Sequence, residues 1–298
     1  MACANITRLR FREADARWSA GLLFFSIAIW PDMCYLIHLR NQFGIDLVLR
    51  WIYPPKHLLY YVLIAKADCV TKRTMIAENL KAVTQRISRS CEKSGRPADA
   101  VKLVCVTKEA SLPEIEEVLA LGVKDIGENR VQDALVKYKA IGGRVIWHLI
   151  GHLQTNKVRD AVGIYSLIHS VDSLRLVEAI DREAKRAGKV QDLLIQVNTS
   201  GEESKFGIGQ YEVRPFFEKA ALYPNINISG LMTMAPEVED PEEARPCFRR
   251  LCELRDELNA IRNTQYAILS MGMSNDFEVA IEEGATIVRI GRAIFGTK

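Results

Sequence analysis

From Met75 onward, the 298-residue chain alternates strand-like and helix-like patterns, and this alternation limits the folds open to it. Short apolar runs of strand length lie at Lys102–Thr107, Asp125–Gly127, Val145–Ile150, Ile164–Ser170, Leu193–Asn198, Ile226–Thr233, Tyr266–Met271 and Thr286–Ile290. Helical patterns lie between them at Pro113–Leu121, Val131–Tyr138, Leu174–Ala187, Tyr211–Leu222, Pro241–Ile261 and Phe277–Glu283. Strands that alternate with helices in this way predict an α/β fold, a (β/α)8 barrel of the TIM type.

A doubly wound sheet is the main rival fold. It favours a Gly-x-Gly-x-x-Gly turn after the first strand, and Lys108–Pro113 contains none. The chain ends soon after Ile290, so we expect no eighth outer helix there. A helix from Ile76 to about Lys93 precedes the first strand, and we expect it to fill that place in the ring.

Residues 1–74 differ from the rest and predict an N-terminal extension of uncertain structure, ahead of a barrel at 75–298. Three of the four tryptophans, Trp18, Trp30 and Trp51, lie in this extension. Its apolar stretch, Trp18–Trp30, is shorter than the roughly 20 residues of a membrane helix. Neither a helix nor a strand period is sustained. An appended segment and a membrane-associating tail both stay open, while the barrel itself is not expected to contact a membrane.

Charge and cysteine usage narrow the function. A net charge of +3, with no basic cluster that contains aromatic residues, argues against a nucleic-acid partner. The seven cysteines are scattered and form no Cys-x-x-Cys pair, which favours reduced thiols in a cytoplasmic protein. His148 and His152 have a spacing that suits a metal on a helix, but they lie on a strand and in the turn after it. We therefore expect no metal site.

Chemistry in a (β/α)8 barrel lies at the C-terminal ends of the strands, so the residues there are candidates. Lys108 follows the first strand, where an amine suits a Schiff base with a carbonyl ligand. A solvated lysine is the alternative. Asn129 follows the second strand, where it either braces a ligand ring or caps the helix that begins at Val131. Lys205 is expected in a loop at the rim.

The last two strands carry a candidate phosphate site. Met273 and Ser274 follow the seventh strand, and Gly291 and Arg292 follow the eighth. Barrels often bind phosphate with the loops at these two positions. Backbone N–H groups and the Ser274 hydroxyl suit a dianion. Together with the lysine amine, these residues indicate pyridoxal 5'-phosphate (PLP) as the ligand.

Arg289 is expected inside the barrel. It shares one face of the eighth strand with Ile287 and Gly291, whereas Val288 and Ile290 share the other face. The apolar pair is expected to pack outward against helices. An unpaired buried charge is costly, so Arg289 needs a partner. Either a ligand atom or an internal carboxylate would supply it.

From about Met75 to Gly296 the chain resembles the PLP homeostasis protein family, whose fold is similar to the N-terminal barrel of alanine racemase. The stretches that carry the resemblance are Val106–Lys108, Gly127–Gln132, Trp147–Lys157, His169–Ser173, Gln196–Asn198, Glu203–Lys205, Gly230–Met232, Leu269–Ser274 and Val288–Gly291. The resemblance implies that Lys108 forms the Schiff base. It places Ser274 and the Gly291 turn at the phosphate, and Arg289 near the pyridine nitrogen.

Two features depart from the family pattern. Arg292 stands where many members carry a small hydroxyl residue, which puts that phosphate contact in doubt. Residues 1–73 have no counterpart.

The residues and the resemblance together predict a carrier rather than an enzyme. An arginine keeps its proton, so it leaves the pyridine nitrogen unprotonated and the ring a poorer electron sink. Racemisation needs acid/base groups on both faces of the substrate. The resemblance implies that the second group, a tyrosine of another domain in alanine racemase, is absent from this chain.

We therefore expect a cytoplasmic, monomeric protein that buffers PLP or delivers it to apo-enzymes, without robust activity and without a catalytic residue. Two alternatives stay open. One is a weak PLP-dependent amino-acid racemase, and the other is a binding module for a different phosphate ligand.

Overall fold

The computed structural model describes residues 75–202, 205–262 and 266–296, and before them the backbone of 24–29, 35–40, 46–51 and 58–74. The chain divides into two compact units, Met1–Thr71 and Lys72–Lys298. The sequence predicted two separate domains that meet after residue 74, and this division into domains stays a prediction.

The first unit contains a three-stranded antiparallel sheet. Its strands are β1 (Phe24–Ile29), β2 (Tyr35–Arg40) and β3 (Asp46–Trp51), in the order β1-β2-β3. The sequence showed no strand period here, so these strands were not predicted. The rest of the apolar stretch, Trp18–Trp30, lies outside the described residues.

Helix α1 (Leu58–Lys93) begins well before the predicted start at Ile76. The prediction was wrong because glycine and proline are the residues that usually end a helix, and neither occurs between Lys56 and Ser94. Within the described part of the chain, no helix combines the length and apolar character needed to cross a membrane.

The second unit is built on a closed barrel of eight parallel strands, as predicted. The strands are β4 (Lys102–Val106), β5 (Asp125–Glu128), β6 (Ile146–Leu149), β7 (Leu167–Val171), β8 (Gln191–Asn198), β10 (Ile226–Met232), β11 (Ile268–Ser270) and β12 (Ile287–Ile290). They pair in sequence order, β12 pairs with β4, and the pairing of β10 with β8 closes the ring. The two-residue strand β9 (Ile208–Gly209) pairs in parallel with the end of β8 and is not part of the ring.

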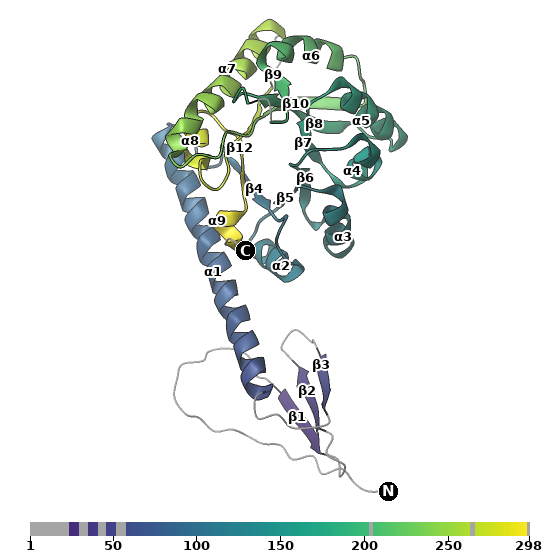
Figure 1. The fold of residues 1–298 in the computed structure, drawn as a ribbon, viewed down its shortest axis with the longest axis vertical. Helices are drawn as coiled ribbons and strands as arrows, with labels where there is room; N and C mark the ends of the chain where they lie inside the picture. The colour runs from purple at the N-terminus through teal and green to yellow at the C-terminus, as the bar shows by residue number, and fades with distance from the viewer. Residues whose placement is uncertain are drawn as a thin grey trace. The chain divides into compact units, whose positions relative to one another are not determined.

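Helices surround this barrel (Figure 1). They are α2 (Leu112–Ala120), α3 (Val131–Ile141), α4 (Val158–Ile164), α5 (Leu174–Arg186), α6 (Val213–Ala220), α7 (Arg245–Arg262), α8 (Phe277–Glu282) and the short α9 (Arg292–Phe295). Helix α1 joins the ring as expected: Asn79 Nδ2 donates to the Ile294 carbonyl at 3.1 Å, and Arg86 pairs with Glu278 at 2.7 Å.

Two helices were not predicted. Helix α4 ends at Ile164, the residue from which the sequence predicted a strand. That strand begins at Leu167 instead. Helix α9 is a single turn after β12, where no helix was expected.

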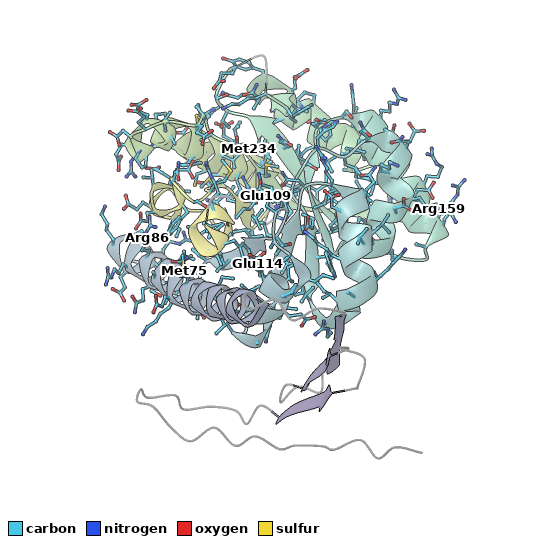
Figure 2. The ribbon with its side chains drawn as sticks, turned by 60° about the horizontal axis from the view of Figure 1, so that its bottom comes forward. Met75, Arg86, Glu109, Glu114, Arg159 and Met234 are labelled. Atoms are coloured by element: carbon cyan, nitrogen blue, oxygen red, sulfur yellow. The ribbon has the colours of Figure 1, made fainter. Side chains whose placement is uncertain are left out.

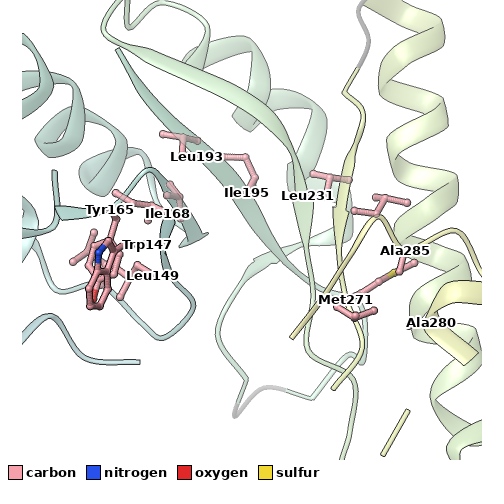
Figure 3. Close-up of a cluster of buried hydrophobic side chains, with 14 of the residues drawn as sticks. Trp147, Leu149, Tyr165, Ile168, Leu193, Ile195, Leu231, Met271, Ala280 and Ala285 are labelled. Atoms are coloured by element: carbon pink, nitrogen blue, oxygen red, sulfur yellow. The ribbon is translucent and has the colours of Figure 1, made fainter. Parts of the chain in front are cut away.

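The core has two layers that follow the alternation of side chains along each strand. The larger layer lies between strands and helices and runs from Trp147 and Leu149 on β6 to Ala280 and Ala285 beside β12 (Figure 3). The smaller layer lies on the opposite face of the strands, inside the barrel. It comprises Val104, Leu167, Leu194, Met232 and Ile287. Val288 and Ile290 belong to the outer layer, as predicted.

Candidate functional site

A pocket of about 610 Å³ lies at the C-terminal ends of the barrel strands. All six predicted site residues line it: Lys108, Asn129, Met273, Ser274, Arg289 and Gly291. Figure 2 shows Glu109 and Met234, two further lining residues, close together, while Arg159 of α4 lies at the outer surface. The structure therefore brings the candidates from four strand ends into one cavity.

Lys108 is held at the pocket by its neighbour Thr107, which is fully buried. Thr107 Oγ1 donates to Glu128 Oε1 at 2.6 Å. Lys137 Nζ donates both to the Thr107 carbonyl, at 2.6 Å, and to Glu128 Oε1, at 2.7 Å. Because these contacts fix the C-terminal end of β4, they also fix the backbone position of Lys108. Its side chain is 45% exposed, and its Nζ lies 3.6 Å from the exposed Glu109 carboxylate, so the amine faces solvent at the pocket.

The turn after β11 presents Ser274. Gly272 has φ +91°, and an added Cβ would lie 2.7 Å from the Ala280 Cβ, so this turn requires glycine. The Met273 N–H donates to Asp276 Oδ1 at 2.6 Å. The Ala293 N–H of α9 donates to Ser274 Oγ at 3.2 Å. The two loops of the predicted phosphate site therefore contact each other.

Arg292 follows Gly291 at the mouth of the pocket. Its Nη2 lies 3.0 Å from Glu237 Oε1, and both side chains are more than half exposed. A cation therefore stands beside the Ser274 turn, and an exposed carboxylate pairs with it.

Arg289 points into the barrel, as predicted, and is 3% exposed. Its Nη1 donates to Ser270 Oγ at 2.7 Å and its Nη2 to the Thr233 carbonyl at 2.9 Å. The structure records no ion pair of Arg289 with any described residue, so the internal carboxylate considered as its partner is not in contact. Burial lowers the pKa of Arg289 to about 10, which leaves the guanidinium charged at neutral pH.

Asn129 lines the pocket and does not cap α3. The N-cap of that helix is Arg130. The backbone of Asn129 packs against Gly151, where an added Cβ would lie 2.3 Å from the Asn129 carbonyl oxygen. The capping interpretation is therefore wrong, and a role of Asn129 in bracing a ligand ring stays a prediction.

His152 and Phe206 form one side of the pocket, with their rings stacked at a centroid distance of 4.3 Å. The sequence predicted a rim loop here but no partner for His152. Lys205, in the same loop, pairs with Glu202 at 3.1 Å. Phe206 precedes a glycine in a loop with no periodic pattern, so its contact with a residue after β6 had no sequence signal.

His148 does not join His152. It lies inside the barrel, where Nδ1 is 3.0 Å from His169 Nε2 and Nε2 is 2.9 Å from Asp125 Oδ1. In the described ranges, no group of three or more metal-ligating side chains is placed to hold an ion.

Comparison with known proteins identifies the family. The family model described as "Alanine racemase, N-terminal domain" matches residues 78–298. A pyridoxal phosphate homeostasis protein of Aquifex aeolicus is 47% identical over 222 residues, which cover 74% of this chain and 97% of that protein. A human protein of the same name is 36% identical over 234 residues, or 74% and 85% of the two chains.

The chain belongs to the pyridoxal phosphate homeostasis protein family. Solved structures agree with this family. PipY of Synechococcus elongatus, solved with PLP bound, is 34% identical to this chain and has a TM-score of 0.65. The match covers 74% of this chain and 100% of PipY. An alanine racemase of Clostridium difficile has a TM-score of 0.60 at 14% identity, over 76% of this chain and 57% of its own. At that identity, the likeness shows the fold alone.

Proposed function

We propose that this protein binds PLP covalently at Lys108 and holds it in reserve in the cytoplasm for transfer to apo-enzymes. The observation that carries the proposal is the meeting of an accessible amine, a buried guanidinium and a hydroxyl-bearing turn in one pocket. The name of the relatives and the PLP-bound structure of PipY support it.

The donor set of the pocket fits the three functional groups of PLP. Lys108 offers a primary amine for the aldehyde, and the aldehyde supplies the carbonyl for reversible condensation with that amine. Ser274, the Gly291 turn and the Arg292 side chain offer donors for the phosphate. Arg289 offers a donor for the ring nitrogen. The volume of about 610 Å³ lies within the range of small-molecule sites, roughly 300–1,000 Å³.

The same residues disfavour efficient catalysis. Arg289 donates and keeps its proton, because its pKa of about 10 is well above neutral pH. It therefore supplies no proton to the ring nitrogen, as strong electron-sink chemistry would require. No tyrosine is found among the described residues that line the pocket. We propose a carrier without robust turnover, which acts as a monomer.

The accessibility of the site suits release as well as binding. Lys108 is 45% exposed, and Glu109 beside it is 59% exposed, so water or a recipient's amine can reach the bond. We therefore propose that PLP leaves by the same open mouth, between the loops after β4 and β10.

Absorbance spectroscopy tests this proposal. Adding PLP to the purified full chain is expected to produce a visible band that Lys108→Ala abolishes and that a control, Lys185→Ala on the exposed face of α5, retains. The loaded protein is expected to restore activity to a PLP-dependent apo-enzyme and to leave a panel of D- and L-amino acids unconverted. A band that survives Lys108→Ala, or enzyme-like racemisation, would contradict the proposal.

A further inference from the structure

Polar side chains inside the barrel form a continuous series that ends at the pocket. Asp125 Oδ1 lies 2.9 Å from His148 Nε2, and His148 Nδ1 lies 3.0 Å from His169 Nε2. His169 Nδ1 lies 2.9 Å from Ser270 Oγ, which accepts from Arg289 Nη1 at 2.7 Å. We call these five residues the relay.

The relay connects the two ends of the barrel. Asp125 is the first residue of β5, at the N-terminal end of the strands, whereas Arg289 lines the pocket at the C-terminal end. His169 and Ser270 lie on β7 and β11, which are not neighbours in the sheet, so their contact crosses the barrel interior. His148, His169, Ser270 and Arg289 are each no more than 3% exposed.

The donor and acceptor capacities suit one direction of the relay. Arginine only donates, so Ser270 Oγ accepts from Arg289. We assign the remaining Ser270 hydrogen to His169 Nδ1, because a neutral His169 can accept it there. His169 then carries its proton on Nε2 and donates it to His148 Nδ1. His148 in turn carries its proton on Nε2 and donates to the Asp125 carboxylate. Both imidazoles are neutral in this arrangement.

Charge considerations favour this direction. Burial lowers the pKa of His169 well below its usual range, which keeps this imidazole neutral. Reversing the bond between the imidazoles while keeping the bond to Asp125 would require an imidazolium at His148. The other charged groups that face the relay are Lys102, whose Nζ is 3.2 Å from Asp125 Oδ1, and Asp276, whose carboxylate attracts Arg289 without contacting it.

We infer that Asp125, acting through the hydrogen bonds of the relay, orients the Arg289 guanidinium toward the ring of the bound ligand. The nearer charge of Asp276 attracts the same guanidinium. Asp125, His148, His169 and Ser270 are then positioning residues, although Asp125 lies at the far end of the barrel. The inference takes only the identity of the ligand, PLP, from the proposed function. The relay itself is present in the free protein.

The first test needs no ligand. Histidine side-chain nitrogens are observed by NMR in full-length protein labelled with 15N-histidine, and the signals are assigned with His148→Gln and His169→Gln. At neutral pH, we expect His169 to carry its proton on Nε2, facing His148 Nδ1. A proton on His169 Nδ1 would overturn the direction of the relay.

The second test measures the ligand. Asp125→Asn keeps an acceptor for His148 and removes the charge, whereas Ser270→Ala cuts the relay. We expect both to move the visible band of bound PLP, or its pH titration, in the same direction as Arg289→Gln does. We also expect Ser270→Ala to weaken PLP and pyridoxal alike, by roughly 10-fold.

The control is Asp192→Asn on β8. It removes an exposed carboxylate that lies, like Asp125, at the N-terminal end of a barrel strand, and it is expected to leave the band unchanged. If Asp125→Asn lowers only the Tm and leaves the band, its titration and both affinities as in wild type, Asp125 is merely structural and the inference is wrong. If wild-type protein shows no band with PLP, the proposed function fails, and the NMR measurement still decides the relay.

Discussion

Ser274→Ala is expected to weaken PLP binding without affecting pyridoxal, the same ring without its phosphate. Ser274 Oγ already accepts the Ala293 N–H at 3.2 Å, so its own hydrogen remains available to a ligand. A hydrogen bond to a charged group contributes about 1.5–3 kcal/mol. Its loss corresponds to a Kd for PLP that rises roughly 10- to 150-fold.

The substitution also costs some stability, and this cost must be kept apart from the binding effect. The Ala293 N–H loses its acceptor, which we expect to destabilise the fold by about 1 kcal/mol because the site is only partly buried. Affinities are therefore measured by absorbance titration well below the Tm. Ser88→Ala, on the exposed side of α1, is the matched control and is expected to leave both affinities as in wild type.

The comparison of the two ligands decides the interpretation. If Ser274→Ala weakens PLP and pyridoxal equally, the turn after β11 does not hold the phosphate and our orientation of the ligand is wrong. Our orientation is supported if Ser274→Ala weakens the binding of PLP alone and the visible band keeps its position.

Three further predictions concern other parts of the chain. Arg289→Gln is expected to shift the visible band of bound PLP or its pH titration, since the ring nitrogen loses a charged donor; an unchanged spectrum and titration would place Arg289 away from the ring. Gly272→Ala is expected to lower unfolding free energy by roughly 2–4 kcal/mol in denaturant titrations, because its Cβ would meet Ala280 and Phe277 at less than 3 Å with φ at +91°. Deleting residues 1–73 is expected to leave a soluble protein that still binds PLP, and a truncated chain that aggregates or takes up no PLP would show that the barrel needs the extension.

The barrel could be predicted because strand and helix patterns alternate along the sequence, and each period reports which side chains are buried. The same reasoning placed Arg289 inside the barrel. Helix α4 escaped prediction because its last residue, Ile164, was assigned to the strand that follows it. The start of α1 was missed because the helix continues past the last clear apolar stripe to the nearest helix breakers.

Contacts across the barrel interior could not be predicted. Alternation shows that His169 and Ser270 face inward, but they lie 101 residues apart on strands that are not neighbours. Only the closed ring brings them within hydrogen-bond distance. The acceptor of Arg289 at Thr233 is a backbone carbonyl, which no side-chain pattern can reveal.

Chemical trapping tests the central claim most directly. The full chain is mixed with PLP, reduced with borohydride, digested and mapped by mass spectrometry. We predict one reduced PLP adduct per chain, on the peptide that contains Lys108, and none on that peptide when the reductant is omitted. An adduct at full occupancy on another lysine, with Lys108 unmodified, would contradict the account.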